Sequence, residues 1–103
     1  MRPISRTPQF ERDLKKCLSK HWEIDAFKEA ICALAKSDEH PLEPGYRDHA
    51  LQGKWTGKRA IHVLSQKQPP RDKWVVVYEL LEDGELLLIR TGDHGVYGGD
   101  ANN

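Results

Sequence analysis

Trp74-Val75-Val76-Val77-Tyr78-Glu79-Leu80-Leu81, followed by Glu82-Asp83-Gly84 and then Glu85-Leu86-Leu87-Leu88-Ile89-Arg90-Thr91, is the stretch that decides the fold. The first run is apolar on both faces and rich in β-branched residues, which is typical of a central strand. The Asp83-Gly84 pair is typical of a tight turn between two strands. The stretch therefore predicts a β-hairpin.

A third strand is predicted just before this hairpin, over Lys58–Leu64. Successive side chains of a strand point to opposite faces, so Ile61 and Val63 share one face and His62 takes the other. If the apolar pair packs on helices, His62 points to the open face of the sheet. A further short strand is predicted at Ile4–Arg6.

Two amphipathic helices are predicted in the first third of the chain. Thr7-Pro8 supplies a capping hydroxyl and a proline at the first helical position of a helix over about 8–20. A second helix begins near Trp22 and ends before Asp38. The residues at helical spacing expected to face the sheet are Phe10, Leu14, Leu18, Ile24, Phe27, Ile31 and Leu34. The prediction is an α+β domain with both helices on one face of a three- to four-stranded antiparallel sheet.

Length and composition limit the class of protein. The 103 residues are expected to form one domain, residues 1–103, and the chain from Gly98 onward is expected to fray. Cys17 and Cys32 are too few for a disulfide framework and predict two reduced thiols in a cytoplasmic protein. No apolar run approaches a membrane span, so no membrane partner is expected.

Charge is distributed in blocks although the net charge is zero. Residues 46–73 carry seven basic and two acidic side chains, a net of +5, and residues 74–103 carry one basic and six acidic side chains, a net of −5. A basic block can attract a phosphate backbone without reading its sequence. The same block can also be a solvated surface balanced by acidic neighbours.

Three histidines lie in short motifs with glycine and arginine: Asp48-His49, Ile61-His62-Val63 and Arg90-Thr91-Gly92-Asp93-His94. Histidine is the side chain whose ordinary pKa allows proton exchange near neutral pH. As a set beside arginines, these residues suggest acid–base chemistry on an anionic substrate.

The order of these motifs resembles a known family. Two helices are followed by Asp48-His49-x-Leu51-x-Gly53-x-Trp55-x-Gly57-x-Arg59-x-x-His62-Val63, by an apolar strand ending at Tyr78, and by Arg90-Thr91-Gly92-x-His94. This layout is similar to the YafQ branch of the RelE-type toxins. The resemblance covers the whole chain in layout, and its specific part is residues 46–97.

The resemblance implies a fold, an activity and partners. The family fold is a small curved antiparallel sheet with two helices on one face. Such a toxin is the stable half of a bacterial toxin–antitoxin pair and enters the ribosome to cut messenger RNA. The implied partners are therefore a cognate antitoxin, the ribosome and mRNA. We expect the antitoxin to cover part of the basic surface around Lys54, Lys58 and Arg59.

Cleavage of RNA without a metal requires the 2′-hydroxyl to attack its own 3′-phosphate, with one group removing a proton and another protonating the leaving oxygen. His49 and His94 are the candidates for base and acid, with His62 as a third member and Asp72 as an orienting group. Which histidine is base and which is acid rests on the resemblance. The residues expected to contact RNA are Lys54, Lys58, Arg59, Arg90 and Tyr97. No carboxylate cluster fits a pair of magnesium ions, so no metal or other cofactor is expected.

Three positions depart from the family pattern. Ala60 follows Arg59 where the family often has an acidic residue. The family commonly has an aspartate just before the central strand, and Asp72 lies one position before that place. The final aromatic residue is usually a phenylalanine four residues past the last histidine, whereas Tyr97 lies three residues past His94. These departures leave a second hypothesis open, in which the chain is a non-catalytic, toxin-like binding module. A related branch that poisons DNA gyrase lacks the histidine set, so the histidines argue against that activity.

Overall fold

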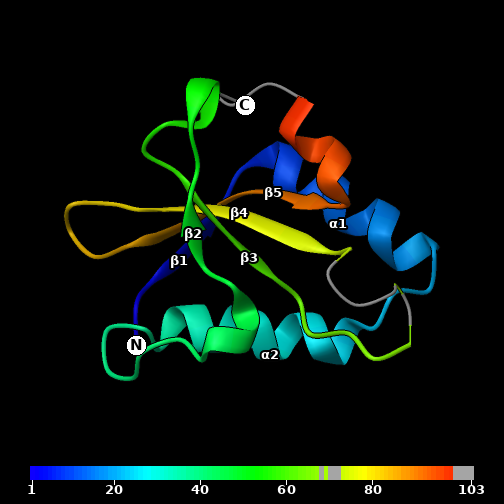
Figure 1. Ribbon diagram of the computed structural model, residues 1–103, viewed down its shortest axis with the longest axis horizontal. Coiled ribbons are helices and arrows are strands. Elements are labelled where there is room, and N and C mark those ends of the chain that lie inside the picture. Colours follow the sequence, from blue (N-terminus) through cyan, green and yellow to red (C-terminus); the bar gives the residue numbers. More distant parts are fainter. Residues whose placement is uncertain (68, 70–72, 99–103) are drawn as a thin grey trace.

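Two helices and a five-stranded sheet make up the computed structural model, which describes residues 1–67, 69 and 73–98 (Figure 1). The sheet has the strand order β1-β5-β4-β3-β2. In chain order the elements are β1 (Ile4–Arg6), α1 (Pro8–Ser19), α2 (Ile24–Ala35), β2 (His49–Ala50), β3 (Arg59–His62), β4 (Val75–Leu80) and β5 (Leu86–Gly92). Three short 3₁₀ helices complete them: η1 (Pro44–Tyr46), η2 (Gly53–Trp55) and η3 (His94–Gly98). The α+β class predicted from the sequence is confirmed.

The sheet is mixed, which corrects the prediction of a wholly antiparallel sheet of three or four strands. The three antiparallel pairs are β2 with β3, β3 with β4, and β4 with β5. The remaining pair is parallel and joins β1 to β5, with Ile4 opposite Leu86. A parallel pair requires a long connection between its strands, and here most of the chain supplies it. The sequence of a three-residue strand carries no signal for the direction of its partner.

Both helices lie on the same face of the sheet and share one apolar core with it. The helices contribute Phe10, Cys17, Phe27, Ala30 and Leu34, and the sheet contributes Ile61, Val76, Tyr78, Leu86 and Leu88. Helix α1 begins as predicted, because the Thr7 hydroxyl accepts a hydrogen bond from the Phe10 amide at 3.0 Å.

Of the seven residues predicted to face the sheet, six belong to this core or pack against it, and Leu18 does not. Leu18 is 39% exposed, so that part of the prediction is wrong. Cys17 is buried instead of Leu18, because positions 10, 13, 14 and 17 lie on one side of a helix, and that side faces the core.

The opposite face of the sheet is partly covered, which corrects the expectation of an open face. Trp55, Val75, Val77, Ile89 and Val96 form a second apolar cluster there. Trp55 comes from η2 and Val96 from η3, so two short segments remote in sequence form a partial second layer. Among the described residues, no helix is long and apolar enough to cross a membrane.

Candidate active site

His49, His62 and His94 lie in a row on the face of the sheet away from the helices. The ring centroids of His49 and His62 are 6.1 Å apart, and those of His62 and His94 are 5.6 Å apart. The three residues come from β2, from β3 and from the first position of η3. The prediction that the histidines converge is therefore confirmed as geometry.

Strand register explains how the first two rings meet. His49 pairs with Ala60 and Ala60 pairs with Val77, while His62 pairs with Val75. Residues directly opposite each other in a sheet point to the same face. Since Val75 and Val77 belong to the second cluster, both histidines lie on that face, as the strand pattern predicted for His62.

His94 is held at the other end of the row by the turn between β5 and η3. Gly92 has φ +147°, a conformation that favours glycine, and Val96 anchors η3 in the second cluster. The Asp93 carboxylate accepts a hydrogen bond from the Gly95 amide at 2.9 Å and so fixes the turn that presents His94.

The three imidazoles differ in exposure. His49 and His94 are exposed, but His62 is only 7% exposed and lies between them. His62 is therefore buried, contrary to the expectation that it points to an open face of the sheet. The outer two rings are open to solvent.

Tyr97 extends the histidine row. Its ring centroid lies 5.9 Å from that of His94 and 6.4 Å from that of Trp55, which it meets edge-on. The buried Trp55 indole N–H donates to the Tyr97 carbonyl at 2.8 Å and so holds Tyr97 in place. Burial raises the pKa of the Tyr97 hydroxyl.

Basic residues expected near the substrate already have partners within the molecule. Lys54 donates to the Gly98 carbonyl at 3.2 Å, and the Lys58 ammonium lies 3.9 Å from the Glu79 carboxylate. Arg59 donates two hydrogen bonds to the Asp48 carboxylate, at 3.2 and 3.0 Å. This hydrogen bonding raises the pKa of the Arg59 guanidinium.

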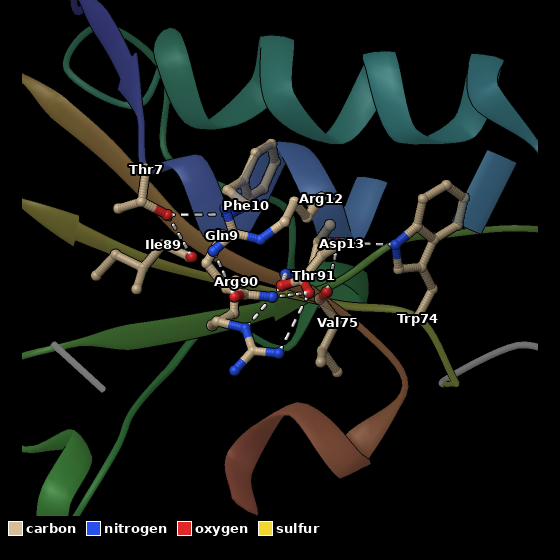
Figure 2. A network of polar contacts seen from close by, with 10 residues as sticks. All are labelled: Thr7, Gln9, Phe10, Arg12, Asp13, Trp74, Val75, Ile89, Arg90 and Thr91. Carbon is tan, nitrogen blue, oxygen red and sulfur yellow. Dashed lines mark hydrogen bonds and ion pairs between the residues drawn. The ribbon is translucent and has the colours of Figure 1, made fainter. Parts of the chain in front are cut away.

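Arg90 forms a more buried ion pair, with Asp13 on α1 (Figure 2). Its guanidinium donates to both oxygens of Asp13, at 2.7 and 3.2 Å, and its side chain is 14% exposed. The guanidinium holds α1 against β5, and this engagement weighs against the expected contact with RNA.

Comparison with known proteins identifies the family to which this chain belongs. The family model for YafQ, the bacterial toxin of a type II toxin–antitoxin system, matches residues 2–96. The chain belongs to the YafQ family. It is 32% identical over 93 residues to the mRNA interferase toxin YafQ of Escherichia coli K12, which covers 90% of this chain and 91% of that protein.

Solved YafQ structures have the same fold. The crystal structure of YafQ from E. coli BL21(DE3) superposes with a TM-score of 0.77 at 30% identity, covering 96% of this chain and all of that one. The toxin in the E. coli DinJ–YafQ toxin–antitoxin complex gives a TM-score of 0.76 at 32% identity, with 95% and 98% covered.

One predicted site residue lies outside the described part of the chain, and two residues beside Arg59 were not predicted. Asp72, expected to orient an imidazole, lies outside the described residues, as do the last five residues of the expected frayed end. Asp48 and Tyr78 were not singled out as site residues, yet the Tyr78 hydroxyl donates to Asp48 at 2.5 Å beside Arg59. The available signals were an acid directly before His49 and a tyrosine inside an apolar strand. Among the described residues, no group of three or more histidine, cysteine or acidic side chains is placed to hold a metal ion.

Proposed function

We propose that this chain is an endoribonuclease toxin that cuts messenger RNA on the ribosome, without a metal, and that a cognate antitoxin neutralises it. The observation that carries the proposal is the row of three imidazoles, two exposed and one buried between them. The naming of the E. coli relative as an mRNA interferase toxin gives independent support.

The row suits cleavage by the RNA's own 2′-hydroxyl. One exposed imidazole removes the hydroxyl proton, the 2′-oxygen attacks the adjacent phosphorus, and the 5′-oxygen leaves with a proton from the other exposed imidazole. The products are a 2′,3′-cyclic phosphate and a 5′-hydroxyl. His49 and His94 are the outer members of the row and fit these two tasks, while His62 lies in contact with both rings.

Cations and an aromatic ring complete the proposed site. Lys54, Lys58 and Arg59 each keep N–H groups beyond those used in the contacts described above, and these can bind phosphate. Tyr97, next to His94, is placed to stack on an unpaired base. We leave Arg90 out of this set because Asp13 occupies its guanidinium. Asp72 remains a proposed orienting residue.

An antitoxin is the proposed regulatory partner. E. coli YafQ has been crystallised with the antitoxin DinJ. We expect the partner of this chain to cover the basic surface around Lys54, Lys58 and Arg59, so that an acidic segment excludes RNA. Action on ribosomes would take place in the cytoplasm.

Messenger RNA cleavage on purified ribosomes tests the proposal. Replacing His94 by alanine removes a proton donor or acceptor, so cleavage should slow by about 10²–10⁴-fold, and His49→Ala should behave alike. His40→Ala, which removes an exposed imidazole outside the row, is the matched control and should cleave normally. Thermal melts verify that each variant is folded. Absence of cleavage by the wild-type chain would favour the binding-module hypothesis instead. Undiminished cleavage by single alanine variants at positions 49, 62 and 94, each normally folded, would show that the histidines are not the catalytic groups.

A further inference from the structure

The His49 ring forms a hydrogen bond with the backbone two residues before it, and this bond determines which ring nitrogen carries the proton. Its Nδ1 atom lies 2.8 Å from the carbonyl oxygen of Arg47. A carbonyl oxygen can only accept a hydrogen bond, so Nδ1 must carry the hydrogen. In the neutral ring the lone pair is then on Nε2, because only one of the two nitrogens is protonated. Neutral histidine in water favours the opposite tautomer.

The carbonyl reaches Nδ1 because of an unusual turn. Arg47 has φ +54° and ψ +43°, in the left-handed region that residues other than glycine seldom occupy. Its amide donates to the Pro44 carbonyl at 3.0 Å, which closes η1. Strained backbone of this kind persists only where surrounding contacts hold it.

Asp48, the residue between the turn and His49, supplies the contacts that hold it. Its carboxylate accepts two hydrogen bonds from Arg59 and one from the Tyr78 hydroxyl. Arg59 lies opposite Tyr78 in the β3–β4 pair. The Tyr78 ring is fully buried in the core under the helices, so this clamp of Asp48, Arg59 and Tyr78 is tied to the packed core.

The clamp and the histidine lie on opposite faces of the sheet. Tyr78 belongs to the core under the helices, whereas His49 is in register with Ala60 and Val77 and lies on the face of the second cluster. The clamp therefore fixes the backbone at residues 47–49 from one side, while the imidazole remains accessible on the other.

We propose that the Asp48–Arg59–Tyr78 clamp positions His49 with its proton on Nδ1, so that Nε2 is the atom that exchanges a proton with RNA. The inference rests on the proposed nuclease function and adds to it the reacting atom and three positioning residues. Nε2 serves whether His49 acts as base or, when doubly protonated, as acid.

Nitrogen-15 spectra of the histidine rings test the proton's position directly. The His49 signals are identified by their loss in His49→Gln. At a pH where the ring is neutral, the wild-type protein should show a protonated Nδ1 and an unprotonated Nε2. In Tyr78→Phe, which loses one hydroxyl and keeps the ring, and in Asp48→Asn, the population should move toward the Nε2–H tautomer.

Cleavage kinetics on ribosomes provide the second measurement. Groups that orient a working histidine typically contribute 10–100-fold, so both clamp variants should lower kcat by at least about tenfold and leave KM nearly unchanged. Glu85→Gln makes the same carboxylate-to-amide change at a residue that accepts from Ser5 and directly precedes β5, outside the clamp, and should retain full activity and the Nδ1–H tautomer. Tyr78→Phe decides the matter if Asp48→Asn fails to fold.

Two results would overturn the inference: an Nε2–H tautomer in the wild-type protein, or clamp variants that keep both the wild-type tautomer and the wild-type kcat. A wild-type chain that cleaves no RNA would instead refute the proposed function, and the ring spectra would still test the proton's position.

Discussion

Removing the Asp13 carboxylate should destabilise this protein far more than removing any exposed acid. Asp13 is 4% exposed and accepts hydrogen bonds from the Gln9 side chain, from two nitrogens of Arg90 and from the Thr91 amide. Figure 2 shows that this network joins α1 to β5, next to the bond between Trp74 and Thr91. Asp13→Ala leaves a largely buried guanidinium and a buried amide without their acceptor.

Breaking a buried ion pair by removing one partner costs about 3–5 kcal/mol. Arg90 retains some contact with water, so the lower end, about 3 kcal/mol, is expected for Asp13→Ala. For a domain of about 100 residues each kcal/mol shifts the melting temperature by about 4–8 °C, and the loss should therefore lower it by about 12 °C or more.

Urea unfolding followed by tryptophan fluorescence measures this loss, and the midpoint should fall without a change in slope. Glu11→Ala is the matched control on the same helix, because its ion pair with Arg6 is exposed and should contribute at most about 1 kcal/mol. Replacing Asp13 and Arg90 together by leucine should recover most of the stability. A loss for Asp13→Ala no larger than that for Glu11→Ala would refute this reasoning.

Two further predictions concern the thiol under α1 and the turn before His94. Burial raises the pKa of Cys17 from 9.0 to about 11, so the stability that the neutral thiol contributes is fully present below pH 9 and is lost as pH rises from 9 through 11. Urea titrations should show a smaller loss between pH 8 and 10 in Cys17→Ala than in the wild type; equal losses would contradict the assignment. In Gly92→Ala the new Cβ would lie 3.0 Å from Val96 at a φ of +147°, so the variant should lose at least about 1 kcal/mol and, by displacing η3, cleave RNA more slowly. Wild-type melting and cleavage by Gly92→Ala would show that the turn tolerates a side chain.

The regular elements of this fold follow from local sequence patterns. The hairpin of β4 and β5 follows from a β-branched apolar run and the Asp83-Gly84 turn, the face of His62 from alternation, and the start of α1 from Thr7-Pro8. Each of these signals acts over a few residues. The direction of β1 was not predictable, since it depends on β5, some 80 residues away.

The sequence did not predict ion pairs and hydrogen bonds between residues that lie far apart along the chain. Asp13 and Asp48 look like ordinary surface acids in the sequence, but the first is buried against Arg90 and the second is shared by Arg59 and Tyr78. The burial of His62 was not predicted, because it depends on side chains from separate elements, the rings of His49 and His94, that the chain brings against it only in the fold.

The parallel pairing of β1 with β5 affects how the protein can be made. β1 and α1 are synthesised before β5, yet both pack against it, so they lack this partner until β5 has been translated. His94 follows β5 in the chain and is delayed with it. A nascent chain therefore has neither the complete sheet nor the complete histidine row until β5 and η3 have both been synthesised.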